Sequence, residues 1–120
     1  MPDVYFLWDG LPLWIELKAI KANKSNLSPQ QVAWHTAHTH AGGLSFILVK
    51  HLGQGCLFLF EGREARSVAS EGVLYAQGQR FEDLDSMFCG LRAVAIDHYS
   101  AVLRPAALVE SPSEEGPGLS

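Results

Sequence analysis

The chain has 120 residues, 48% of them hydrophobic, and a formal net charge of −4. This length fits one domain with its own core. No apolar run reaches the ~20 residues that cross a bilayer, and no signal-peptide pattern opens the chain. We therefore expect a cytoplasmic protein with no membrane partner, and the negative charge argues against a simple DNA-binding module, which usually carries a basic excess.

The charge divides unevenly along the chain. Residues 1–60 carry four lysines against three acids, a balance of +1, together with four of the five histidines. Residues 61–120 carry five arginines against ten acids, a balance of −5. If a cation neutralised two N-terminal acids, the first half would become clearly positive, and the acidic half would face away from nucleic acid or towards a protein partner.

Two apolar runs, residues 4–8 and 13–20, are predicted strands, and Asp9-Gly10 between them is a strong signal for a two-residue hairpin. Pairing of these strands would bring Asp3 and Glu16 to the same end of the sheet. One acid from each strand would then form a site for a hard cation.

A lysine accompanies the second acid. Residues i and i+2 of a strand share a face, so Glu16 and Lys18 project together. Two opposite charges on one strand face are costly to bury unless they pair or bind something. Lys21 and Lys24 continue the series at three-residue intervals, either as a solvated loop or, beside a metal site, as phosphate contacts.

A helix is predicted over residues 29–41, because Ser28-Pro29 supplies an N-cap and a first-position proline and Gly42-Gly43 stops the helix. Gln31 and His35 stand at i and i+4 and share one face. They are candidate contacts to a ligand or to nucleic acid, and the alternative is that they hydrogen-bond the hairpin or water. We favour the functional role for Gln31.

The histidines and cysteines do not predict a zinc site. At 3.6 residues per turn, His38 lies about 60° from His35 but His40 lies ~140° from it. No Cys falls in the same stretch, and no His-Glu-x-x-His motif occurs. Cys56 and Cys89 have no metal-binding spacing, and we expect both to be buried free thiols.

The remaining elements form a core and a long helix. Residues 44–50 and 56–60 are predicted core strands, the first covered on both faces because it is nearly continuously apolar. Residues 61–72 are ambiguous, and residues 73–76 are a predicted short edge strand. One amphipathic helix is predicted from Phe81 to about Arg104, interrupted or bent at Gly90, with its apolar face formed by Phe81, Leu84, Phe88, Leu91, Ala95, His98 and Val102.

This order predicts an α/β or α+β domain with a mixed sheet flanked by helices. The domain is expected to span residues 1–110. Residues 111–120 are rich in Pro, Ser, Glu and Gly and are predicted to be disordered.

Several of these residues together carry a resemblance to a nuclease superfamily. They are Pro2-Asp3, Glu16-Leu17-Lys18, the Leu-Ser-Pro-x-Gln pattern within residues 27–35, and Gly42-Gly43 followed by the run at 45–49. Over residues 2–50 the chain resembles the PD-(D/E)XK nucleases. In order and spacing it is most similar to small virus-type replication-repair (VRR-NUC) and Holliday-junction-resolvase-like nucleases, often encoded by phages.

The resemblance implies a restriction-endonuclease-like fold and a metal-dependent endonuclease that hydrolyses DNA, with selectivity for a junction or flap. It implies Mg²⁺, replaceable by Mn²⁺, held by Asp3, Glu16 and the Leu17 backbone carbonyl. Asp3, Glu16, Lys18 and Gln31 would be the catalytic set, with Lys18 orienting or deprotonating water or neutralising charge on the phosphate. Lys21, Lys24 and His35 would contact the DNA. A homodimer in the cytoplasm, the host's if the chain is phage-encoded, is expected, because cutting two strands commonly requires two symmetry-related sites.

One feature departs from the family pattern. Related nucleases usually have a helix before the first strand, whereas the motif aspartate here is Asp3. Three explanations are open: the fold is a reduced form of the family fold, a partner subunit supplies the missing helix, or the N-terminus is truncated. The competing function is a catalytically weak, nuclease-derived module that binds nucleic acid or a replication or repair protein.

Overall fold

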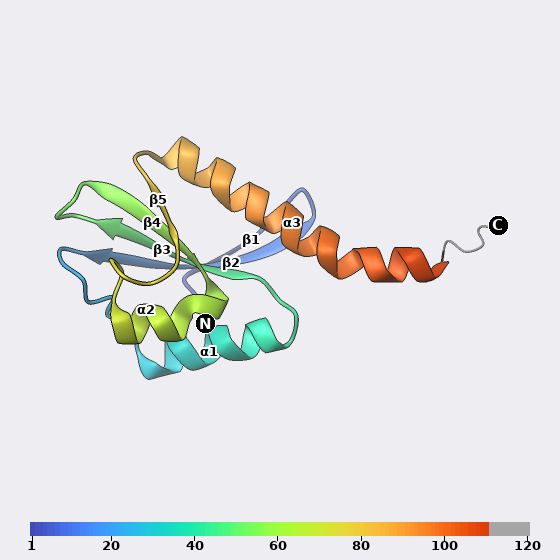
Figure 1. The fold of residues 1–120 in the computed structure, drawn as a ribbon, viewed down its shortest axis with the longest axis horizontal. Coiled ribbons are helices and arrows are strands. Elements are labelled where there is room, and N and C mark those ends of the chain that lie inside the picture. The colour runs from blue at the N-terminus through green and yellow to red at the C-terminus, as the bar shows by residue number, and fades with distance from the viewer. Residues whose placement is uncertain (111–120) are drawn as a thin grey trace.

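The computed structural model describes the backbone of residues 1–110 and the side chains of residues 1–101. Its elements in chain order are β1 (Val4–Trp8), β2 (Leu11–Ile20), α1 (Pro29–His40), β3 (Ser45–His51), β4 (Cys56–Glu61), a 3-10 turn η1 (Gly62–Glu64), α2 (Ala65–Glu71), β5 (Gln79–Phe81) and α3 (Leu84–Glu110). Figure 1 shows these elements as a sheet with helices on both sides.

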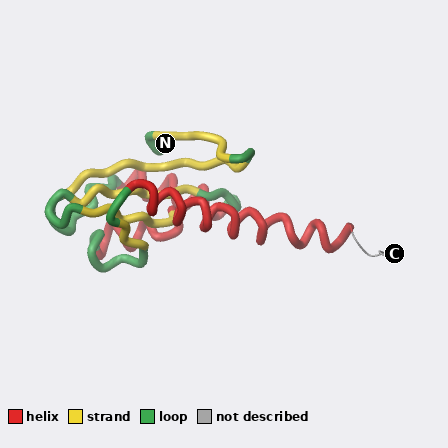
Figure 2. Tube along the Cα trace, turned by 90° about the horizontal axis from the view of Figure 1, so that it is seen from above, coloured by secondary structure: helices red, strands yellow, loops and turns green. Residues whose placement is uncertain are grey.

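The strands form one five-stranded mixed sheet in the order β1-β2-β3-β4-β5. β2 and β3 are parallel and are connected through α1, whereas the other three neighbouring pairs are antiparallel. β1 is therefore an outer strand of the sheet (Figure 2). This arrangement confirms the predicted α/β (α+β) fold class.

The sheet separates two hydrophobic clusters. On one face, Phe46 of β3 packs in a cluster with Met87 and Leu91 of α3. On the other face, Ile47 of β3 packs in a cluster with Val68 of α2, and α1 borders this cluster. Adjacent residues of β3 thus point into opposite cores, as period-two alternation requires. The prediction that this strand is covered on both faces is confirmed.

The start of α1 follows the predicted capping chemistry. The Ser28 hydroxyl accepts a hydrogen bond from the Gln31 backbone N–H at 3.1 Å, and the Gln31 side chain accepts one from the Ser28 N–H at 2.9 Å. This reciprocal capping box satisfies two backbone donors that a helix start leaves free. Pro29 occupies the first turn, as predicted.

The prediction of a short edge strand at residues 73–76 is wrong. The short strand at that edge of the sheet is β5, which pairs with β4. Val73 is buried, and its N–H bonds the Asn23 carbonyl, while the Ala76 N–H bonds Gly72 in a turn. Val73 and Ala76 thus pack in the cluster that contains Val68, whereas Leu74 and Tyr75 are exposed, and none of the four residues pairs in the sheet. The ambiguous segment before it forms η1 and α2.

α3 runs to Glu110, beyond the predicted end at Arg104, and its last part extends past the sheet (Figure 2). A proline removes one backbone hydrogen bond, which disfavours a helix without forbidding it. Gly90 does not interrupt α3. A Cβ there would lie 2.4 Å from Phe81 Cζ, so glycine allows β5 to approach the helix closely.

The buried face of α3 agrees with the predicted one only in part. Leu91 and Ala95 are buried, as predicted, and Met87 is buried although it was not predicted, whereas Leu84 and Phe88 are 56% and 39% exposed. The two free thiols differ in exposure. Cys56 is buried, as predicted, but Cys89 is exposed, so the prediction that it is buried is wrong. Cys89 belongs to the side of α3 that faces away from the sheet.

Among the residues that the structure describes, no helix combines the length and apolar character needed to cross a bilayer. The predicted disorder of residues 111–120 lies outside the described residues.

Candidate metal centre and active site

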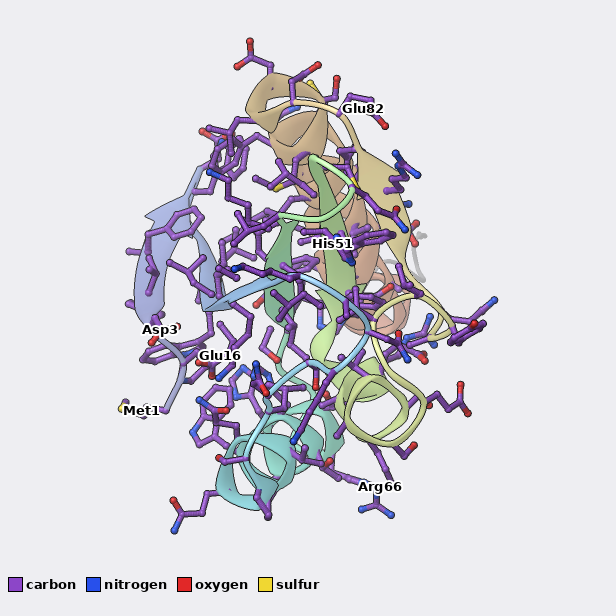
Figure 3. All side chains as sticks on the ribbon, turned by 90° about the vertical axis from the view of Figure 1, so that its left-hand side faces the viewer. Met1, Asp3, Glu16, His51, Arg66 and Glu82 are labelled. Atoms are coloured by element: carbon purple, nitrogen blue, oxygen red, sulfur yellow. The ribbon has the colours of Figure 1, made fainter. Side chains whose placement is uncertain are left out.

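An acid pair lies at one end of the β1–β2 hairpin. The register pairs Val4 with Ile15, so the preceding residue, Asp3, stands opposite Glu16. The Asp3 carboxylate accepts a hydrogen bond from the Leu17 backbone N–H at 2.7 Å, which ties it to β2. Figure 3 shows Asp3 and Glu16 close together at this end of the sheet. The prediction that the hairpin brings the two acids together is confirmed.

The two acids differ in exposure and surroundings. Asp3 is exposed, whereas Glu16 is only 2% exposed, between the sheet and α1. One Glu16 oxygen, Oε2, accepts a hydrogen bond from Gln31 Nε2 at 3.1 Å. The other, Oε1, lies 3.7 Å from His35 Nε2, and neither of these two buried atoms has a hydrogen-bond partner within the described structure.

Burial raises the pKa of Glu16 from its usual 4.5 to about 7. The neighbouring Asp3 carboxyl group acts in the same direction, partly through charge repulsion, while the Lys18 ammonium opposes the shift. A carboxylate taken from water is costly unless it is compensated. Glu16 therefore keeps a proton up to near neutral pH, and a nearby cation would favour its ionised form.

His35 is held on its other side by β3. Its Nδ1 lies 2.7 Å from the Ser45 hydroxyl, and both residues are buried. Burial lowers the pKa of His35 from 6.5 to about 4, with the charge of His38 adding to the shift. The imidazole is 0% exposed, so the geometry does not support the expected contact to nucleic acid. A position on the inner face of α1 gives His35 a role towards Glu16 instead.

Both polar atoms of the Gln31 side-chain amide form hydrogen bonds, and together they link the start of α1 to the acid pair. Its Oε1 closes the capping box with Ser28, and its Nε2 donates to Glu16. The expectation that Gln31 lies near the site is confirmed as to position. Ser45 was missed, although a small polar residue at the start of an apolar strand was the available signal.

The lysines follow the acid along β2 and its loop. Lys18 is half-buried and donates from Nζ to the Asn26 carbonyl at 3.2 Å. It forms no ion pair in the described structure. Lys21 and Lys24 are exposed in the loop after β2, where contact with phosphates stays a prediction.

The donor set fits a hard cation. Asp3, Glu16 and the Leu17 carbonyl would supply oxygen ligands of the kind that Mg²⁺ prefers, and Mg²⁺ commonly keeps several waters. The orphaned Glu16 Oε1 and the repulsion between the two carboxyl groups are both features that a cation would relieve. Across the described residues, no group of three or more His, Cys, Asp or Glu side chains is arranged to hold a metal ion. A metal here would thus depend on backbone oxygen and water.

A scan against protein-family models and searches of curated proteins and of solved structures found no match to this chain. Membership of the PD-(D/E)XK superfamily accordingly stays a prediction from the sequence motif. The arrangement itself offers two carboxylates, an amide that orients one of them, and an ammonium on the same strand face. These groups can place a cation and a positive charge beside a phosphate.

Proposed function

We propose that the protein is a metal-dependent endonuclease that hydrolyses DNA phosphodiester bonds at the Asp3–Glu16 acid pair. The observation that carries the proposal is the placement of Asp3 opposite Glu16 on paired strands, with Lys18 two residues along the same strand face. In this proposal the Asp3 and Glu16 carboxylates bind the metal, and the Lys18 ammonium acts on the phosphate.

Asp3, Glu16 and the Leu17 carbonyl would hold Mg²⁺, or Mn²⁺ in its place. When bound, the metal would supply Lewis-acid stabilisation of charge on the phosphate and lower the pKa of a water. Gln31 fixes the Glu16 carboxylate by donating to Oε2, which keeps that oxygen from rotating. This pre-orientation reduces the reorganisation needed when substrate arrives.

Lys18 would provide the positive charge. Its hydrogen bond goes to the neutral Asn26 carbonyl, which leaves the ammonium charge free to act on an incoming phosphate. It would orient or deprotonate the attacking water, or neutralise charge as it develops on the phosphate. Lys21 and Lys24 would contact flanking phosphates.

The test is cleavage of labelled linear duplex, single strand, flap and four-way junction with Mg²⁺, Mn²⁺ or EDTA. Glu16→Gln and Lys18→Ala should abolish metal-dependent cutting. The matched controls Glu61→Gln and Lys50→Ala change the same residue types outside the site and should cut like wild type. No cutting by a folded wild type on any substrate would contradict the proposal.

A second candidate is a binding module without catalysis. The observation that favours it is the exposed acidic start of α3, where Glu82, Asp83 and Asp85 gather. Such a surface suits a basic protein partner better than DNA. Binding of a basic replication or repair protein that is lost on charge reversal there, with no cleavage by wild type, would favour this candidate.

A further inference from the structure

An aromatic pair lies directly beside the acid pair on the same two strands. Tyr5 of β1 pairs with Trp14 of β2, and their ring centroids are 4.5 Å apart. Since residues i and i+2 share a strand face, Tyr5 is on the face of Asp3, and Trp14 is on the face of Glu16. The aromatic pair therefore lies two strand positions, about 7 Å, from the acid pair.

The aromatic pair is braced from α1. The edge of Trp34 meets Trp14 with a centroid distance of 5.6 Å, and Trp34 stacks on His38 at 4.6 Å and 18°. Tyr5 is 49% exposed, whereas these three supporting rings are half-buried. Tyr5 is thus an exposed ring on a fixed aromatic backing, which limits the entropy lost when a flat ligand stacks on it.

The groups on this face of β2 follow the order aromatic ring, acid, ammonium. Trp14, Glu16 and Lys18 occupy successive positions of one strand face, so the ring and the ammonium lie on opposite sides of the acid. Asp3 and Tyr5 are the exposed members of the two pairs, so a DNA strand along β1 would place one phosphate at Asp3 and the attached base at Tyr5, with Lys18 on the far side of the acid pair. The exposed Lys21 and Lys24 continue the positive charge in the same direction.

We propose that Tyr5, backed by Trp14, is a stacking site for an unpaired DNA base next to the phosphate that is cut. This inference rests on the proposed nuclease function and names its substrate class as single-stranded DNA or an unpaired flap. Aromatic stacking beside a positively charged track is how proteins bind single strands without reading sequence. A base in a duplex is already stacked on both faces and has no free face for Tyr5.

The test measures binding in EDTA, where cleavage cannot occur. A labelled oligothymidylate and a blunt-ended linear duplex without unpaired bases are titrated with wild type, Tyr5→Ala, Tyr5→Phe and the neighbouring control Leu7→Ala. Leu7 is 62% exposed on the same strand face but has no ring. Tyr5→Ala should weaken single-strand binding roughly ten-fold and leave duplex binding unchanged, Tyr5→Phe should restore it, and Leu7→Ala should have no effect.

Equal weakening of single-strand and duplex binding by Tyr5→Ala, no weakening at all, or an equal effect of Leu7→Ala would overturn the stacking site. Thermal unfolding of each variant identifies a loss of fold, and Tyr5→Phe keeps the packing against Trp14 in that event. Metal-dependent cleavage is then measured on the same two substrates. Tyr5-dependent binding without cleavage would overturn the proposed nuclease function but keep the stacking site. Cleavage of the single strand that Tyr5→Ala does not change would keep the nuclease function and overturn the stacking site.

Discussion

Glu16 Oε1 and His35 Nε2 face each other across 3.7 Å from β2 and α1, both buried and both without a hydrogen-bond partner in the described structure. Burial disfavours charge on both groups, so the pKa of the acid rises to about 7 and the pKa of the imidazole falls to about 4. The folded protein therefore keeps a proton on Glu16 in a pH range where the unfolded chain keeps it on His35.

The two shifted pKa values act on stability in opposite pH directions. The raised pKa of Glu16 contributes stability that is present below pH 4.5 and lost as pH rises through 7. The lowered pKa of His35 contributes stability that is present above pH 6.5 and lost as pH falls through 4. Between pH 4.5 and 6.5 the two contributions oppose each other, so their sum changes little.

Glu16→Gln should expose the contribution of His35. The free energy of unfolding of this variant, relative to wild type, should rise with pH between 4.5 and 7, by at most about 1.4 kcal/mol per pH unit, because the Glu16 contribution that falls over this range is gone. Urea unfolding at half-unit pH steps measures it. Parallel profiles for wild type and Glu16→Gln would show that the two groups do not exchange a proton.

Metal binding should depend on pH in the opposite sense to Glu16 protonation. A cation needs the ionised carboxylate, so Mg²⁺ must displace the proton when pH lies below the raised pKa of Glu16, about 7. The rise in melting temperature with added Mg²⁺ should therefore be larger at pH 8 than at pH 6. Glu16→Gln should show no rise at either pH, and an equal rise in that variant would place the metal elsewhere.

The sequence predicted the acid pair because hairpin chemistry and strand alternation are local. Asp9-Gly10 set the turn, and the turn set which residues of the two strands face each other. The pairing of His35 with Ser45 was not predictable in this way, because it depends on how α1 lies across β3. The proton exchange was also hidden, since burial of Glu16 comes from tertiary packing.

The helix limits show the same distinction. Ser28-Pro29 and the capping box are local signals, and they placed the start of α1 correctly. Pro105 predicted an end that α3 does not have, and the apolar run at residues 73–76 packs without pairing. The placement of Val73 depends on Asn23, which is distant in the sequence, whereas the last part of α3 continues past the sheet.

Ser45 and Gly62 should be coupled in stability. A Cβ added at Gly62 would lie 2.0 Å from Ser45 Oγ and 3.1 Å from His35 Nδ1. Gly62→Ala should destabilise wild type, because the hydroxyl must leave the imidazole. Ser45→Ala alone should cost about 1–3 kcal/mol, since it leaves a buried ring nitrogen without a partner.

A double-mutant cycle tests the coupling. With the hydroxyl gone, Gly62→Ala should cost at least about 0.5 kcal/mol less in the Ser45→Ala background than in wild type. Chemical denaturation of the four proteins gives the coupling energy. Strict additivity would mean that the hydroxyl is not what crowds Gly62.

Gln31 and Ser28 separate the fold of α1 from the chemistry of the site. Both residues form the capping box, but only Gln31 also donates to Glu16. Ser28→Ala and Gln31→Ala should each lower the free energy of unfolding by about 1 kcal/mol through the lost cap. Only Gln31→Ala should lower kcat for metal-dependent cleavage, because only it releases the Glu16 carboxylate. Stopped-time cleavage assays at saturating Mg²⁺ measure kcat for both variants, well below their melting temperatures. Equal losses of kcat would assign the effect to the helix start, and an unchanged kcat in Gln31→Ala would remove Gln31 from the site.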